Sequence, residues 1–97
     1  MTAHFCILES RKRYSDVLVY RIAQMSFEEL TYLTEECQLE HTRREFLTKH
    51  FGKSKVHTEL GAAIQEARRL TEMLFGGGKE SFISILVTPE DRLFTEN

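Results

Sequence analysis

Hydrophobic and polar positions form three short segments that predict β-strands. Residues 4–10 (HFCILES) and 15–23 (SDVLVYRIA) are apolar and partly alternating, and the loop between them lacks the Asn-Gly signature of a tight turn. Residues 81–88 (SFISILVT) are rich in β-branched side chains and apolar on both faces, so we expect this strand to lie centrally. The first two strands are also apolar on both faces. They are therefore either covered on both sides, or covered on one side and joined to a partner on the other.

A first helix is predicted over residues 26–51. Ser26 and Glu29 form an S-x-x-E capping box, in which each side chain satisfies a backbone N–H of the other residue. The apolar stripe of this helix consists of Phe27, Leu30, Leu33, Cys37, Leu47 and Phe51. The stripe thins between residues 40 and 46, and Gly52 is expected to end the helix in a left-handed conformation.

A second helix is predicted to start within residues 54–58 and to end at Phe75. Its apolar face repeats at intervals of three and four residues and consists of Val56, Leu60, Ala63, Ile64, Ala67, Leu70 and Leu74. The tail TPEDRLFTEN, residues 88–97, favours a short final helix capped by Thr88, with an edge strand as the alternative.

These elements predict one α+β domain over residues 1–97, because about 100–200 residues form a domain. The expected order is ββααβ: a small antiparallel sheet, a long helical hairpin packed on one face, and a short C-terminal helix or edge strand. The sequence does not determine the order of the strands in the sheet.

Three glycines and a lysine, residues 76–79, raise the question of a phosphate-binding loop. Such a loop connects a strand to the amino end of a helix, where the backbone N–H groups and the helix dipole attract anions. Here the order is reversed, since a helix precedes the glycines and a strand follows them. The run also departs from the phosphate-loop motif at Met73 and Glu80. We therefore interpret the glycines as the end of a helix.

Composition and charge narrow the classes of protein. The chain has 41% hydrophobic and 29% charged residues with a net charge of −2, which is ordinary for a globular protein and gives no general attraction to polyanions. No apolar run reaches the ~20 residues of a membrane span, and the first residues do not form a secretory signal. Two cysteines are too few for a secreted disulfide framework, so we expect a soluble, cytoplasmic protein.

Candidate catalytic and metal-binding residues are few. Cys37 and His41 would share a face of an intact helix, as half of a zinc site completed by His50 or His57, or as a nucleophile and its base. No second ligand pair, orienting group or oxyanion donor accompanies them. We therefore predict no metal, no cofactor, no catalytic residue and no enzymatic activity.

Charged residues are segregated along the first helix. Four glutamates form a candidate partner-binding face: Glu28, Glu35, Glu36 and Glu40. Basic residues form two clusters, which could instead bind nucleic acid if they shared a face: Arg11, Lys12 and Arg13, and Arg43, Arg44, Lys49, Lys53 and Lys55. Acid near a helix amino end and base near its carboxyl end are also what the helix dipole favours, by about 0.3–1 kcal/mol per charge.

Element lengths point to a partner. A helix over residues 26–51 would span about 38 Å, whereas eight-residue strands span only about 26 Å. Either this helix breaks where its stripe thins, or another molecule covers the overhang; we favour a second copy related by a twofold axis. The predicted function is a non-enzymatic protein–protein interaction module, a small regulator, adaptor or inhibitor, acting as a homodimer. A small nucleic-acid-binding regulator is the alternative.

Overall fold

A computed structural model describes residues 3–12, 14–77 and 80–87 and confirms the α+β class and, broadly, the ββααβ order. The strands are β1 (Ala3–Arg11), β2 (Leu18–Gln24) and β3 (Ser81–Val87). The helices are α1 (Phe27–Thr31), a π-helical segment η1 (Tyr32–Glu36), α2 (Glu40–Phe51) and α3 (Leu60–Phe75). Residues 88–97, for which a short helix or edge strand was predicted, lie outside the described residues.

The sheet is mixed, and its central strand is β1. The strand order is β2-β1-β3: β2 is antiparallel to β1 and β3 is parallel to it, so Ile7 pairs with Ile22 on one side and Ile85 on the other. A wholly antiparallel sheet with residues 81–88 at its centre was the wrong prediction. Because α3 carries the chain back to the end of the sheet where β1 begins, β3 starts beside Ala3 and runs in the same direction as β1.

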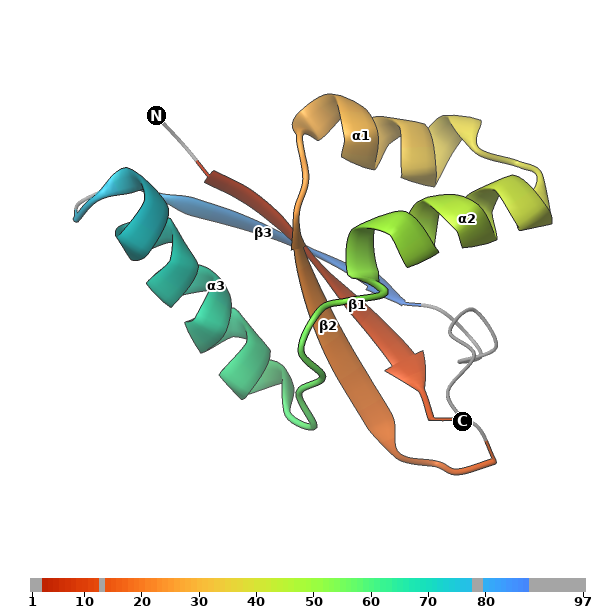
Figure 1. The fold of residues 1–97 in the computed structure, drawn as a ribbon, viewed down its shortest axis with the longest axis horizontal. Coiled ribbons are helices and arrows are strands. Elements are labelled where there is room, and N and C mark those ends of the chain that lie inside the picture. The colour runs from red at the N-terminus through yellow and green to blue at the C-terminus, as the bar shows by residue number, and fades with distance from the viewer. Residues whose placement is uncertain (1–2, 13, 78–79, 88–97) are drawn as a thin grey trace.

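Helices cover both faces of the sheet, and the prediction of a helical hairpin on one face is wrong. Figure 1 shows α3 on one side of the strands and the α1–α2 pair on the other. Successive side chains of β1 point to opposite faces, which divides the core in two. The α1–α2 side contains Cys6, Leu8, Ala23, Met25, Leu33, Leu47 and Phe51. The α3 side contains Phe5, Ile7, Tyr20, Ala63 and Ala67.

The helix predicted over residues 26–51 breaks in two. After η1 the chain becomes extended at Cys37 (φ −80°, ψ 97°), turns, and returns as α2 beside α1 (Figure 1). The turn lies just before the segment where the apolar stripe thins, and it lets Leu33 and Leu47 reach the same core. The overhang that was expected to need a second copy therefore does not exist, and the argument from element lengths for a homodimer fails.

The predicted start of the first helix and the predicted ends at Phe51 and Phe75 are confirmed. Ser26 Oγ accepts from the Glu29 N–H at 3.1 Å, and Glu29 Oε1 accepts from the Ser26 N–H at 3.0 Å, which completes the capping box. α3 ends at Phe75, as expected, and Gly76 follows with a φ of 89°, which favours glycine. α2 ends before Gly52, but the φ of Gly52 is −60°, not left-handed. Glycine suits this position because a Cβ there would stand 2.5 Å from the Thr48 carbonyl oxygen.

Candidate functional site

One edge of the sheet is capped by the chain itself. His57 exchanges two backbone hydrogen bonds with Tyr20 of β2, at 2.8 and 2.9 Å. The Ser54 hydroxyl accepts from the Ile22 N–H at 3.2 Å and donates to the Ile22 carbonyl at 2.8 Å. These bonds satisfy the outward-facing N–H and C=O groups of Tyr20 and Ile22. They also explain why α3 starts at Leu60, later than predicted, since residues 54–57 are bound to the sheet.

The opposite edge, formed by β3, carries large apolar side chains that are about half exposed. The exposed fractions are 54% for Phe82, 49% for Ile85 and 60% for Val87. Within the described part of the chain, β3 makes backbone ladder bonds to β1 and none to any segment on its outer side. A long apolar edge of this kind is a template for pairing with another strand.

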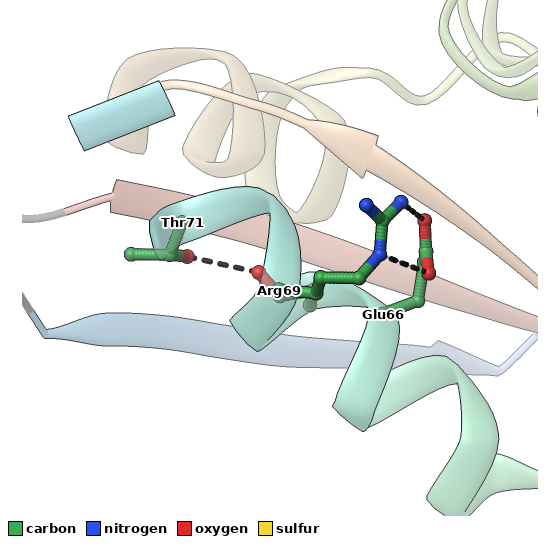
Figure 2. A network of polar contacts seen from close by, with 4 residues as sticks. Glu66, Arg69 and Thr71 are labelled. Carbon is green, nitrogen blue, oxygen red and sulfur yellow. Dashed lines mark hydrogen bonds and ion pairs between the residues drawn. The ribbon is translucent and has the colours of Figure 1, made fainter. Parts of the chain in front are cut away.

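The start of β3 is held firmly against α3. The Ser81 hydroxyl donates to Thr71 Oγ1 at 2.8 Å, and the buried Thr71 hydroxyl donates to the Ala67 carbonyl at 2.9 Å. Figure 2 shows the Thr71 bond and, on the same helix, the two-pronged ion pair between Arg69 and Glu66. The hydrogen bond from Arg69 is the main reason that the pKa of Glu66 lies below its ordinary value. The hydrogen bond between Ser81 and Thr71 joins the first residue of β3 to α3.

A groove of about 470 Å3 is lined by residues from the start of α1, the end of α3 and the adjoining ends of β1 and β2. It is lined by His4, Gln24, Met25, Ser26, Phe27, Glu29 and Phe75. The His4 ring stacks on Phe82, with ring centres 5.4 Å apart, and meets the edge of Phe27 at 6.5 Å. The sequence pattern placed Phe27 in the core stripe, yet its side chain is 67% exposed. Phe27 directly follows the helix cap, and this position in the sequence could have indicated that its side chain is exposed.

Beside this groove, Glu29 links α1 to α2. One carboxylate oxygen accepts from the Ser26 N–H, and the other lies 3.2 Å from His50 Nε2. The His50 ring packs on Phe46, with centres 4.4 Å apart. The pKa of Glu29 lies below its ordinary value of 4.5, chiefly because of the backbone hydrogen bond from Ser26, with smaller contributions from the Ser26 hydroxyl and from positive charge on His50 and Lys49.

Glu29 is expected to contribute to the pH dependence of stability. Because its folded pKa is lowered, its contribution is complete above about 4.5 and is lost as the pH falls through the folded pKa. Glu29→Gln should therefore lower the thermal midpoint at pH 7, and the difference from the wild type should shrink as the pH approaches 3. Circular dichroism melts at both pH values measure this difference. A difference that stays constant with pH would contradict the assignment.

The predicted acidic residues are exposed and lie at the two ends of the α1–η1 segment and at the start of α2. Glu28 follows Phe27 at the start of α1, whereas Glu35, Glu36 and Glu40 lie near the turn between η1 and α2. Glu40 also pairs with Arg44 at 3.5 Å. The role of these four glutamates in partner binding stays a prediction.

The described basic residues are divided between separate regions. The β1–β2 loop, which contains Lys12, lies below α2 in Figure 1, at the lower ends of β1 and β2. Arg11 lies 3.9 Å from Asp16, and Arg43 donates to the Leu33 carbonyl at 3.1 Å. Lys49, Lys53 and Lys55 are exposed on α2 and on the segment that follows it, and Arg13 lies outside the described residues. This arrangement does not favour a single phosphate-binding face.

The intact helix that would align Cys37 with His41 does not exist. Cys37 is buried at the turn, its thiol hydrogen-bonds the Tyr32 hydroxyl and so raises the pKa of Tyr32, and His41 is exposed on α2. Burial raises the pKa of the Cys6 thiol to about 11, which disfavours the reactive thiolate. Within residues 3–12, 14–77 and 80–87, no three His, Cys, Asp or Glu side chains group as metal ligands.

None of the described helices has the length and apolar character needed to cross a bilayer. Comparison of the chain with protein-family models, with curated proteins and with solved structures gave no match. The function must therefore be argued from the geometry of the site.

Proposed function

We propose that this chain is a non-enzymatic, cytoplasmic protein-interaction module, a small regulator, adaptor or inhibitor, and that it acts as a homodimer through the outer edge of β3. The observation that carries the proposal is the difference between the two edges of the sheet. Ser54 and His57 cap the outer edge of β2 with hydrogen bonds, whereas the outer edge of β3 presents half-exposed apolar side chains. Edge strands that do not pair are usually blunted by charge, proline or a covering segment, and the described part of β3 has no charged residue and no proline.

The sequence of β3 favours a second copy as the pairing strand. It is nearly symmetric about Ser84: Ile83 and Ile85 flank this residue, and Phe82 and Leu86 stand one position further out. In antiparallel pairing about a twofold axis through Ser84, Ile83 faces Ile85 of the copy, and Phe82 faces Leu86 of the copy. Each facing pair shares a side of the sheet, and apolar cross-strand pairs contribute about 0.2–1 kcal/mol each.

Pairing would also resolve the conflict between the sequence of β3 and its position. A strand that is apolar on both faces is typical of the centre of a sheet, yet β3 lies at an edge. Joining two copies would place both β3 strands at the centre of a six-stranded sheet. The side chains that gain cover are already half buried, so we expect a dimer that dissociates on dilution rather than a permanent one.

Ile85→Lys tests the dimer. Lysine at a half-exposed position is tolerated in the monomer, but in the dimer it would face Ile83 of the copy. Because the interface has twofold symmetry, this unfavourable contact would occur twice. We expect sedimentation equilibrium to show a dimer for the wild type at tens of micromolar, and the variant to raise the dissociation constant at least about tenfold, or about 1.4 kcal/mol.

Val17→Lys is the matched control, because Val17 is 50% exposed and lies at the β1–β2 loop, away from β3. It should leave the dissociation constant unchanged. A wild-type protein that is monomeric at tens of micromolar would overturn the dimer proposal, as would equal weakening by the two lysine variants.

A further inference from the structure

We propose that the groove between α1 and α3 binds the guanidinium group of an arginine side chain of a protein partner. The groove volume of about 470 Å3 lies within the range of about 300–1,000 Å3 that is usual for ligand sites. This inference rests on the proposed interaction function, since it names the chemistry of the partner, but it does not depend on the homodimer. The groove-lining residues belong to β1, β2, α1, α3 and the connection from β2 to α1, which contributes Met25 and the N-cap Ser26; none of them belongs to β3.

Aromatic rings supply the first part of the site. Phe27 and Phe75 enter the groove from helices on opposite faces of the sheet, and the His4 ring lies against Phe27. A phenylalanine that is 67% exposed adds little to the core, so its ring is available to a ligand. The planar guanidinium group stacks on such rings, and cation–π contacts contribute about 0.5–2 kcal/mol, depending on how far water is excluded.

Negative charge supplies the second part. Glu29 lines the groove and its side chain is 43% exposed; its two oxygens already contact the Ser26 N–H and His50 Nε2, and the remaining lone pairs of the carboxylate can accept from a ligand. Glu28 is exposed on the same turn of α1. The seven described lining residues include no lysine or arginine, and Gln24 adds a neutral amide whose oxygen can accept a hydrogen bond. A cation complements this lining, whereas an anion would meet the Glu29 carboxylate.

Arginine suits this arrangement better than lysine. The guanidinium group can stack on Phe27 and donate to the Glu29 carboxylate at the same time, because its donors lie in the plane of the group. The lysine ammonium is compact and strongly hydrated, and it has no face to stack. We therefore expect the site to discriminate between two side chains of equal charge.

The test uses four labelled nonapeptides of glycine and serine that differ only at the central residue: arginine, lysine, citrulline or norleucine. Citrulline keeps the shape of arginine without its charge, and norleucine keeps only an apolar chain. We expect fluorescence anisotropy to detect the arginine peptide in the range of about 0.1–1 mM, with the citrulline peptide at least about tenfold weaker and the lysine peptide between them. The NMR signals of His4 and Phe27 should shift during the titration.

Two variants and a control locate the site. Phe27→Ala and Glu29→Gln should each weaken the arginine peptide at least about fivefold, while Leu39→Ala, at a 64% exposed position beyond η1, should not change its affinity. Thermal melts establish that each variant is folded. Equal binding of the arginine and citrulline peptides, no binding below about 5 mM, or unchanged affinity of Phe27→Ala would each overturn the inference.

Ile85→Lys separates this inference from the dimer. We expect this monomeric variant to keep its affinity for the arginine peptide, because Ile85 does not line the groove. If the wild type proves monomeric and still selects arginine, the dimer proposal fails and the groove assignment stands. If the protein dimerises through β3 but does not select arginine, the groove assignment fails and the dimer proposal stands.

Discussion

Phe51→Ala is expected to lower the free energy of unfolding by about 3–5 kcal/mol, the usual loss when a buried phenylalanine is truncated. Phe51 is the last residue of α2, its side chain is fully buried, and it joins the core cluster that contains Cys6 and Leu8 of the central strand. A domain of this size has a total stability of only about 5–15 kcal/mol. The variant should therefore unfold at a much lower urea concentration, as followed by circular dichroism.

Phe27→Ala is the matched control, because it makes the same chemical change at a side chain that is 67% exposed. Its cost should stay within about 0.5 kcal/mol, as is usual for a surface substitution. The comparison tests whether α2 folds back onto the sheet. Similar losses for the two variants would contradict the arrangement of α1 and α2 and the exposure of the groove.

Local features of the fold could be predicted because their causes lie within a few residues. The capping box at Ser26, the end of α3 before Gly76 and the burial of Ala63 and Ala67 depend on neighbouring backbone groups or on helical spacing. The strands were found from the same kind of signal. Each of these predictions depends only on the chemistry of one helical turn or on the regular spacing of side chains along one helix or strand.

The position of the break in the first predicted helix could not be predicted from local signals of this kind. A thinning apolar stripe indicated weakness between residues 40 and 46, but the turn is at residues 37–39, where the backbone is extended at Cys37 and the Cys37 side chain is buried. Its position depends on the fit of Leu33 and Leu47 to the same core, which is a tertiary property. The same holds for the division of the helices between two faces of the sheet. Each helix has one apolar face, and the sequence does not say which side of the sheet that face meets.

The candidate site was the least predictable part of the molecule. The cap on β2 is made by Ser54 and His57, more than thirty residues further along the chain, and no pattern in the residues around Ser54 indicates its hydrogen bonds to Ile22. The groove likewise combines β1 with the ends of two helices. The apolar pattern of β3 was found from sequence, but the pattern alone predicted a central strand, since it cannot distinguish a strand covered within one chain from a strand completed by a second copy.

Ile7→Ala is expected to lower the free energy of unfolding by about 2–5 kcal/mol, through lost burial and the cavity left behind. Ile7 lies in the central strand, is fully buried, and packs with Tyr20 and Ala63 beneath α3. Ile85→Ala provides a close comparison, because Ile85 in β3 is the register partner of Ile7. The two isoleucines differ mainly in that Ile7 lies in the central strand and Ile85 in an edge strand.

In dilute protein, at about 1 μM, Ile85→Ala should cost clearly less than Ile7→Ala, since about half of the Ile85 side chain is already in water. At tens of micromolar, the loss from Ile85→Ala should increase, because dimerisation stabilises the folded wild type by mass action and this variant weakens the interface. The loss from Ile7→Ala should stay constant, because Ile7 is covered within one chain. Urea unfolding curves at both concentrations give all four values. A loss for Ile85→Ala that equals that of Ile7→Ala in dilute protein would contradict the strand order β2-β1-β3, and one that does not grow with concentration would contradict pairing through β3.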